Sequence, residues 1–149
     1  MRVALGVDHR GFAIKDVLGL MLREDGHDVV DCGTDSTDSV DYPDIAAAVG
    51  RALRDGDADR GVVVCGSGAG AVIAANKMRG IRAACAHDTY TAHQCVEHDD
   101  ANVLALGSGV VGVDVIREVV RAFLDARLVP EERYLRRLRK VEALEAAQD

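Results

Sequence analysis

Short apolar runs alternate with longer amphipathic segments along most of the chain. The runs have the length of β-strands and consist almost entirely of apolar residues, which is typical of parallel strands that are buried on both faces. They cover residues 3–7, 27–31, 61–65, 81–86 and 103–106. We therefore expect five parallel strands, each buried on both faces.

The segments between these runs have helical length and carry an apolar stripe at helical spacing. Helices are expected to begin near Phe12, Asp44, Ala69, Thr89 and Asp114, and a last helix is expected from about Glu131 to Ala147. The two prolines, Pro43 and Pro130, each suit the first turn of a helix. The alternation predicts an α/β protein: a three-layer α/β/α sandwich with a five-stranded parallel, Rossmann-like sheet and a C-terminal helix.

Composition narrows the class of protein further. A chain of 149 residues that is 48% hydrophobic, without repeats or linkers, predicts a single domain over residues 1–149. A net charge of -7 argues against nucleic acid and anionic membranes as partners. No apolar stretch is long enough to span a bilayer, and the N-terminus lacks the pattern of a signal peptide. The four cysteines have irregular spacing and no CxxC pair, so we expect reduced thiols and a cytoplasmic protein.

The third apolar run leads directly into a glycine-rich turn, Cys65-Gly66-Ser67-Gly68-Ala69-Gly70. In open parallel sheets, ligands bind beyond the carboxyl ends of the strands, where such loops lie. Three alternating glycines allow several backbone N–H groups to approach one anion, and the following helix adds the positive end of its dipole. The turn is therefore predicted to bind a phosphate, a carboxylate or a developing enolate.

Other known glycine motifs fit this turn less well. Gly66, Gly68 and Ala71 match the dinucleotide pattern G-x-G-x-x-A, with Asp88 downstream, but the match falls on the third strand. No Gly-Lys-Ser/Thr follows, as a P-loop requires, and Ser67 lacks the preceding glycine of a nucleophile elbow. The dinucleotide pattern also leaves the thiol of Cys65 unexplained.

Cys65 is the candidate catalytic residue of the turn. A thiolate is favoured at the N-terminus of a helix and can act there as a base. Free cysteines are otherwise usually small buried hydrophobes, and this is the role expected of Cys32, Cys85 and Cys95.

Two further segments carry possible acid/base groups. Asp8 and His9 close the first run, and they are either ligand contacts at the carboxyl end of the sheet or a pair of surface loop residues. His98 lies in a polar cluster before the fifth run and is either a capping or solvent residue or an acid/base group, because histidine titrates near neutral pH. His87 and His93 are expected to be surface or structural residues. No metal site is expected, because the nearest set of possible ligands has no recognised spacing: His93, Cys95, His98 and Asp99.

A basic stretch near the C-terminus stands out in this acidic chain. Arg133 and Arg137 are four residues apart, share one face of the last predicted helix, and would suit a phosphate. The alternative is that these charges are only the solvated face of an apolar stripe, which comprises Leu135, Leu138, Val141 and Leu144.

Taken together, the motifs resemble the type B ribose-5-phosphate isomerase family, which includes galactose-6-phosphate isomerase subunits. The resemblance covers almost the whole chain and rests on these segments: Asp8-His9-Arg10-Gly11-Phe12, Asp31-Cys32-Gly33-Thr34, Asp41-Tyr42-Pro43, Cys65-Gly66-Ser67-Gly68, Ala74-Ala75-Asn76-Lys77, Gly80-Ile81-Arg82-Ala83, Asn102-Val103-Leu104-Ala105 and the arginine-rich tail.

The resemblance implies a role for each of these residues. Cys65 would move a proton between C1 and C2 of an open-chain sugar, through an enediolate held by the turn amides, Gly66 to Gly70, and by the Ser67 hydroxyl. His98 would open the furanose ring. Further implied substrate contacts are Asp8, His9, Tyr42, Asp99, Arg133 and Arg137. The family implies a homodimer or a dimer of dimers with active sites shared between subunits, and no metal or organic cofactor.

Three positions depart from the family pattern. Gly109 stands where the family usually has a phosphate-binding arginine, Tyr134 where a histidine is common, and Asp99 where an asparagine is expected. Asp99 adds negative charge near an anionic substrate, which should weaken phosphate binding unless Arg136 or Arg10 compensates.

We therefore expect isomerisation of ribose 5-phosphate and ribulose 5-phosphate. One alternative is the same chemistry on another sugar or sugar phosphate, a tetrose or a hexose such as galactose 6-phosphate or allose 6-phosphate. The other is a non-catalytic module that binds a nucleotide or a sugar phosphate.

Overall fold

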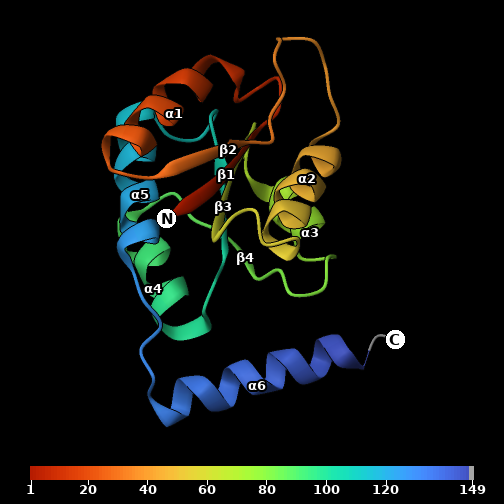
Figure 1. The fold of residues 1–149 in the computed structure, drawn as a ribbon, viewed down its shortest axis with the longest axis vertical. Helices are drawn as coiled ribbons and strands as arrows, with labels where there is room; N and C mark the ends of the chain where they lie inside the picture. Colours follow the sequence, from red (N-terminus) through yellow and green to blue (C-terminus); the bar gives the residue numbers. More distant parts are fainter. Residues whose placement is uncertain (148–149) are drawn as a thin grey trace.

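The computed structural model describes residues 1–147 and contains one five-stranded parallel sheet with helices on both faces (Figure 1). The order of the strands across the sheet is β2-β1-β3-β5-β4. Their bounds are β1 Arg2–Val7, β2 Asp28–Asp31, β3 Arg60–Cys65, β4 Ala83–Cys85 and β5 Val103–Gly107. The predicted parallel sheet is confirmed.

Six α-helices alternate with or follow these strands in residues 1–147. They are α1 Lys15–Glu24, α2 Tyr42–Arg54, α3 Ala69–Ala75, α4 Thr89–Asp99, α5 Val113–Asp125 and α6 Glu132–Ala146; a 3-10 turn, η1 Phe12–Ile14, precedes α1. The layered α/β class and the C-terminal helix are confirmed. That residues 1–149 form a single domain stays a prediction, and residues 148–149 lie outside the described part.

The two faces of the sheet carry side chains of different size. Helices α1, α4 and α5 cover the face onto which β1, β3 and β5 project valine and leucine (Figure 1). Helices α2 and α3 cover the other face, where several strand residues are small, including Ala4, Gly6 and Gly61. A Cβ built at Gly61 would lie only 2.4 Å from Cγ1 of Val49 on α2. Small residues thus let α2 approach the sheet closely.

Two strand predictions need correction. The edge strands β2 and β4 are only partly buried, because each has a single neighbouring strand, and β4 is limited to three residues.

One of the two predictions for the prolines is confirmed. Pro43 lies in the first turn of α2 as predicted, whereas Pro130 precedes the first residue of α6 by two positions.

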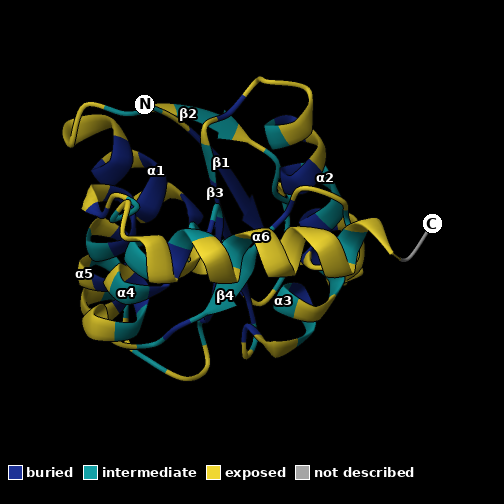
Figure 2. Ribbon diagram, turned by 90° about the horizontal axis from the view of Figure 1, so that it is seen from below, coloured by how far each residue is buried: buried dark blue, intermediate teal, exposed yellow. Residues whose placement is uncertain are grey.

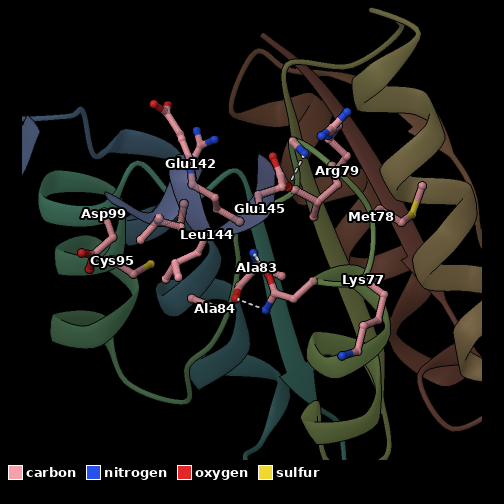
Figure 3. A pocket seen from close by; sticks show the side chains of 16 residues that line it. Lys77, Met78, Arg79, Ala83, Ala84, Cys95, Asp99, Glu142, Leu144 and Glu145 are labelled. Atoms are coloured by element: carbon pink, nitrogen blue, oxygen red, sulfur yellow. Dashed lines mark hydrogen bonds between the residues drawn. The ribbon is translucent and has the colours of Figure 1, made fainter. Parts of the chain in front are cut away.

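Helix α6 crosses the end of the sheet where the strands begin (Figures 1 and 2). Within α6 the buried residue is Tyr134, whereas Val141 and Leu144 are 51% and 68% exposed. A cavity of about 690 Å³ lies between the last turns of α6 and the segment that leads into β4 (Figure 3). In residues 1–147, none of the helices has both the length and the apolar composition needed to cross a membrane.

The close approach of α2 can be tested by adding one methyl group. We expect Gly61→Ala to lower the free energy of unfolding by about 1–3 kcal/mol, because the new Cβ overlaps Val49 in a packed interior. Gly19→Ala is the control: it adds the same group inside α1, where the nearest atom belongs to the flexible Arg23 side chain, and should be neutral or stabilising by up to about 1 kcal/mol. Urea denaturation of both variants measures this, and equal effects would contradict the packing argument.

Candidate active site

Cys65 is the last residue of β3 and lies at the carboxyl end of the sheet. Its side chain points toward the α2 and α3 layer and is 4% exposed. The backbone N–H of Gly68 donates a hydrogen bond to the Cys65 Sγ at 3.1 Å. Gly68 then leads the chain into α3 in the left-handed conformation, with φ of +81°, which a residue without a Cβ adopts readily. The predicted turn therefore wraps back onto the thiol.

The rest of the turn is shaped by residues from other elements. A Cβ at Gly70 would lie 2.6 Å from Cζ of Tyr42, so the Tyr42 ring at the start of α2 rests on the turn backbone. The hydroxyl oxygen of Ser67 accepts a hydrogen bond from the N–H of Ala69 at 3.3 Å. Tyr42 and Ser67, both predicted from the sequence, are thus brought to the turn.

The loop after β1 lies beside the turn, because β1 and β3 are neighbours in the sheet. Successive connections leave these two strands in opposite directions, which makes their carboxyl ends a topological switch point, the usual ligand position in open α/β sheets. Asp8 is 4% exposed, and its Oδ1 accepts hydrogen bonds from the N–H groups of Arg10 and Gly11 at 2.8 and 3.1 Å. Asp8 therefore holds the shape of this loop.

His9 connects the same loop to the segment before α2. Its Nδ1 accepts a hydrogen bond from the N–H of Val40 at 3.2 Å, so the neutral ring carries its proton on Nε2. The start of the segment between β2 and α2 is held by Lys15, whose Nζ forms ion pairs with Asp31 and Asp35 at 2.8 and 2.9 Å. His9 is thus positioned as a hydrogen-bond donor at the carboxyl end of the sheet.

The loop after β5 also lies at the carboxyl end of the sheet, beside the glycine turn. The Ser108 hydroxyl donates to the carbonyl oxygens of Arg10 and Cys65 at 2.8 and 3.2 Å, which ties three loops together. His87 accepts a hydrogen bond from the N–H of Gly107 at 2.9 Å, in keeping with the structural role expected of it.

The other cysteines differ in their surroundings. Cys95 is buried as expected, and burial, together with Asp99, raises its pKa to about 11. Cys32 and Cys85 are only partly buried, and burial raises the pKa of both. Cys85 is more than a core residue, since its Sγ lies 2.8 Å from where a Cβ of Gly68 would be. Its place at the end of β4 indicated the carboxyl end of the sheet, but its contact with the turn follows from the order of the strands.

A second group of predicted residues gathers at the opposite end of the sheet. The ring of His98, near the end of α4, stacks on Tyr134 of α6 with centroids 4.0 Å apart. The His98 Nδ1 lies 2.7 Å from Nε2 of Gln94. Arg133 also contacts the Tyr134 ring: its guanidinium lies 4.6 Å from the ring centroid and donates a hydrogen bond to the Tyr134 hydroxyl at 2.8 Å.

The sheet separates this second group from Cys65 within one chain. Helix α4 ends where β5 begins, so His98 lies at the amino end of the sheet, and α4 covers the face opposite to the one Cys65 faces. Arg133 and Arg137 follow on α6 at the same end (Figure 1). Asp99 lines the cavity beneath α6 rather than the glycine turn (Figure 3). The predicted residues therefore form two clusters, one around Cys65 and one around His98.

Within residues 1–147, no group of three or more histidine, cysteine or acidic side chains is placed to hold a metal ion. At the switch point of the sheet lies a buried thiol that accepts a hydrogen bond from the backbone N–H of Gly68. The fold and this site define an open α/β protein with a cysteine in a glycine-rich turn at the carboxyl end of its sheet.

Comparison with known proteins assigns the family. Residues 3–141 match the family described as Ribose/Galactose Isomerase. The chain is 43% identical to ribose-5-phosphate isomerase B of Escherichia coli over 85% of each chain, and 39% identical to D-erythrulose-4-phosphate isomerase of Pectobacterium atrosepticum over 85% of this chain and 84% of that one. The type B ribose 5-phosphate isomerase of Trypanosoma cruzi superposes with a TM-score of 0.95 at 45% identity, over 99% of both chains. The chain belongs to this family and is a sugar-phosphate aldose-ketose isomerase.

The left-handed glycine in the turn, Gly68, provides a test of the site. Gly68→Ala places a Cβ in a left-handed conformation and against Cys85 and Leu106, so the N–H donor at Cys65 should be displaced and isomerase turnover should fall about a hundredfold or more. Gly26→Ala is the matched control, since Gly26 has the same φ of +81° and no atoms within 4 Å of its Cβ position. It should cost about 1–2 kcal/mol of stability and leave turnover unchanged. Steady-state kinetics and thermal denaturation of both variants measure this, and equal turnover would refute the role of Gly68.

Proposed function

We propose that the protein interconverts ribose 5-phosphate and ribulose 5-phosphate, with Cys65 as the base. The observation that carries the proposal is the contact between the Cys65 Sγ and the Gly68 N–H at the switch point of the sheet. Two of the relatives described above are named for ribose 5-phosphate, whereas a third is named for erythrulose 4-phosphate. A tetrose or hexose phosphate is therefore the alternative substrate class. Because the chain is an isomerase, the alternative of a non-catalytic binding module is not supported.

In the proposed reaction, Cys65 as thiolate removes the proton from C2 of the open-chain aldose. The electron pair forms the C1–C2 double bond of an enediolate, and negative charge develops on the sugar oxygens next to the turn. N–H groups of Gly66 to Gly70 and the Ser67 hydroxyl would stabilise that charge. The Cys65 thiol then returns the proton to C1, while the hydroxyl proton passes from O2 to O1, which yields the ketose. Tyr42, His9 and Asp8 would hold the sugar, in keeping with their positions around the turn.

Ring opening precedes this step and is assigned to His98. If the Gln94 amide donates to Nδ1, as its Nε2 position at 2.7 Å favours, the neutral imidazole carries its proton on Nε2. That proton can be given to the ring oxygen of the furanose while a base takes the proton of the C1 hydroxyl. Stacking on Tyr134 fixes the plane of the ring, which suits a group that must aim at one atom.

The separation of the two clusters supports a shared active site. His98, Arg133 and Arg137 cannot approach Cys65 of their own chain across the sheet, so we propose that they serve the site of a partner subunit in a homodimer or a dimer of dimers. The exposed Val141 and Leu144 and the open cavity under α6 fit a surface that a second subunit covers. Arg133 and Arg137 would then bind substrate phosphate, with Asp99 near the same subunit contact. A cytoplasmic location stays a prediction.

The reaction can be tested in deuterated water with a panel of phosphorylated and free sugars. We expect ribose 5-phosphate to give the highest kcat/KM and to incorporate one deuterium at C1 or C2, because the transferred proton exchanges on a thiol. Cys65→Ala should lower turnover at least about a hundredfold, since a general base typically contributes that much or more. Cys95→Ala, which changes a buried thiol away from the turn, is the control. A higher kcat/KM for a tetrose or hexose phosphate would show that ribose 5-phosphate is not the preferred substrate. Retained turnover in Cys65→Ala would show that Cys65 is not the base.

Sharing of the site predicts complementation between two inactive variants. Cys65→Ala and His98→Asn homodimers should each be at least about a hundredfold less active than wild type. A heterodimer of the two, isolated with two different affinity tags, keeps one site with both groups intact and should recover about half of the wild-type activity per dimer. If both groups act within one chain, every site in the heterodimer is broken and it will be as inactive as either homodimer.

A further inference from the structure

Arg10 is an exposed cation in the loop that follows β1. Within residues 1–147, its guanidinium makes no hydrogen bond or ion pair. The backbone of Arg10 is nonetheless held on both sides: its N–H donates to the Asp8 Oδ1 at 2.8 Å, and its carbonyl accepts from the Ser108 hydroxyl at 2.8 Å. A fixed backbone therefore carries a charged group that has no partner of its own.

Two glycines determine where this guanidinium lies. A Cβ built at Gly66, the residue after Cys65, would be 3.6 Å from the Arg10 Cζ, and a Cβ built at Gly109 would be 3.6 Å from the Arg10 Nη2. The guanidinium thus rests between the turn that follows β3 and the loop that follows β5, next to Cys65. Longer side chains at either glycine would compete for the same space.

The chemistry of this group favours one type of ligand. A guanidinium stays charged at every physiological pH and presents a planar fork of N–H donors that matches two oxygens of a phosphate. The nearest acidic side chain in the loop, Asp8, already accepts two backbone hydrogen bonds through Oδ1. Arg10 therefore offers its full hydrogen-bonding capacity to an anion bound beside Cys65.

We infer that Arg10 binds the phosphate group of the substrate, and that Gly66 and Gly109 leave the room for it to do so. The inference rests on the proposed function, since it places the phosphate of the sugar phosphate at the Gly109 side of the site. The phosphate keeps its charge throughout the reaction, so Arg10 contributes equally to binding of substrate and transition state. Its loss should therefore raise KM and leave kcat nearly unchanged.

Arg10→Ala and Arg54→Ala are the matched pair of variants. Both remove one exposed arginine, but Arg54 lies at the end of α2, at the amino end of the sheet. We expect Arg10→Ala to raise KM for the sugar phosphate about 10–100-fold, as for a lost hydrogen bond to a charged group, and to weaken binding of inorganic phosphate by a similar factor in phosphorus-31 NMR titrations. Arg54→Ala should match wild type in both measurements.

A second variant tests the shared space directly. Adding Gly109→Arg to Arg10→Ala puts a guanidinium back between the two loops and should recover most of the phosphate affinity. Equal phosphate affinity in Arg10→Ala and Arg54→Ala, or no measurable phosphate binding by wild type, overturns the inference. The NMR titration needs no turnover: if wild type isomerises none of the sugars but Arg10→Ala loses phosphate, the proposed function fails and the inference stands. If wild type isomerises ribose 5-phosphate and Arg10→Ala has an unchanged KM, the proposed function stands and the inference about Arg10 fails.

Discussion

The left-handed backbone of Gly68 is the constraint on which the geometry around Cys65 depends. With φ of +81°, Gly68 reverses the chain from the turn into α3, and its N–H, which residues 65–67 place, lies 3.1 Å from the sulfur of Cys65. The same reversal brings the turn against Cys85 on one side and places Gly70 beneath the ring of Tyr42 on the other. A β-carbon at Gly68 would meet both backbone strain and a steric clash with Cys85 and Leu106, so the path of the turn into α3 depends on a residue without a side chain.

The second constraint is the sheet itself, which divides the polar residues of one chain into two clusters. Parallel strands bring Asp8, Cys65 and Ser108 to the carboxyl end of the sheet, because each lies at or just after the end of a strand. Helix α4 runs back to the amino end of the sheet before β5 begins, and His98 lies near the end of this helix. A reaction that needs both Cys65 and His98 therefore needs two chains, and a partner that covers the exposed Val141 and Leu144 of α6 would remove apolar surface from water.

Much of this arrangement was predictable from the sequence, because the central strands and the glycine turn are local patterns. Apolar runs identified β1, β3 and β5 closely, since these strands are buried on both faces and are apolar except for Arg2 and Arg60 at the start of β1 and β3. The same reasoning failed for β2 and β4, because the position of a strand at the edge of a sheet depends on strand order, which a local pattern does not contain. The separation of His98 from Cys65 and the contact of Cys85 with the turn depend on the same information.

The position of Arg10 also depends on contacts between loops, and it bears on how an acidic protein holds an anionic substrate. The net charge of -7 is spread over the surface, and at physiological salt its influence is screened beyond about 8 Å. Binding is then decided by the charges within that distance of the ligand. Next to Cys65 these include a guanidinium without a protein partner, lying against Gly66 and Gly109. The side chain missing at Gly109 therefore does not leave the site without a cation: the absence of a Cβ there gives Arg10 the space to supply one.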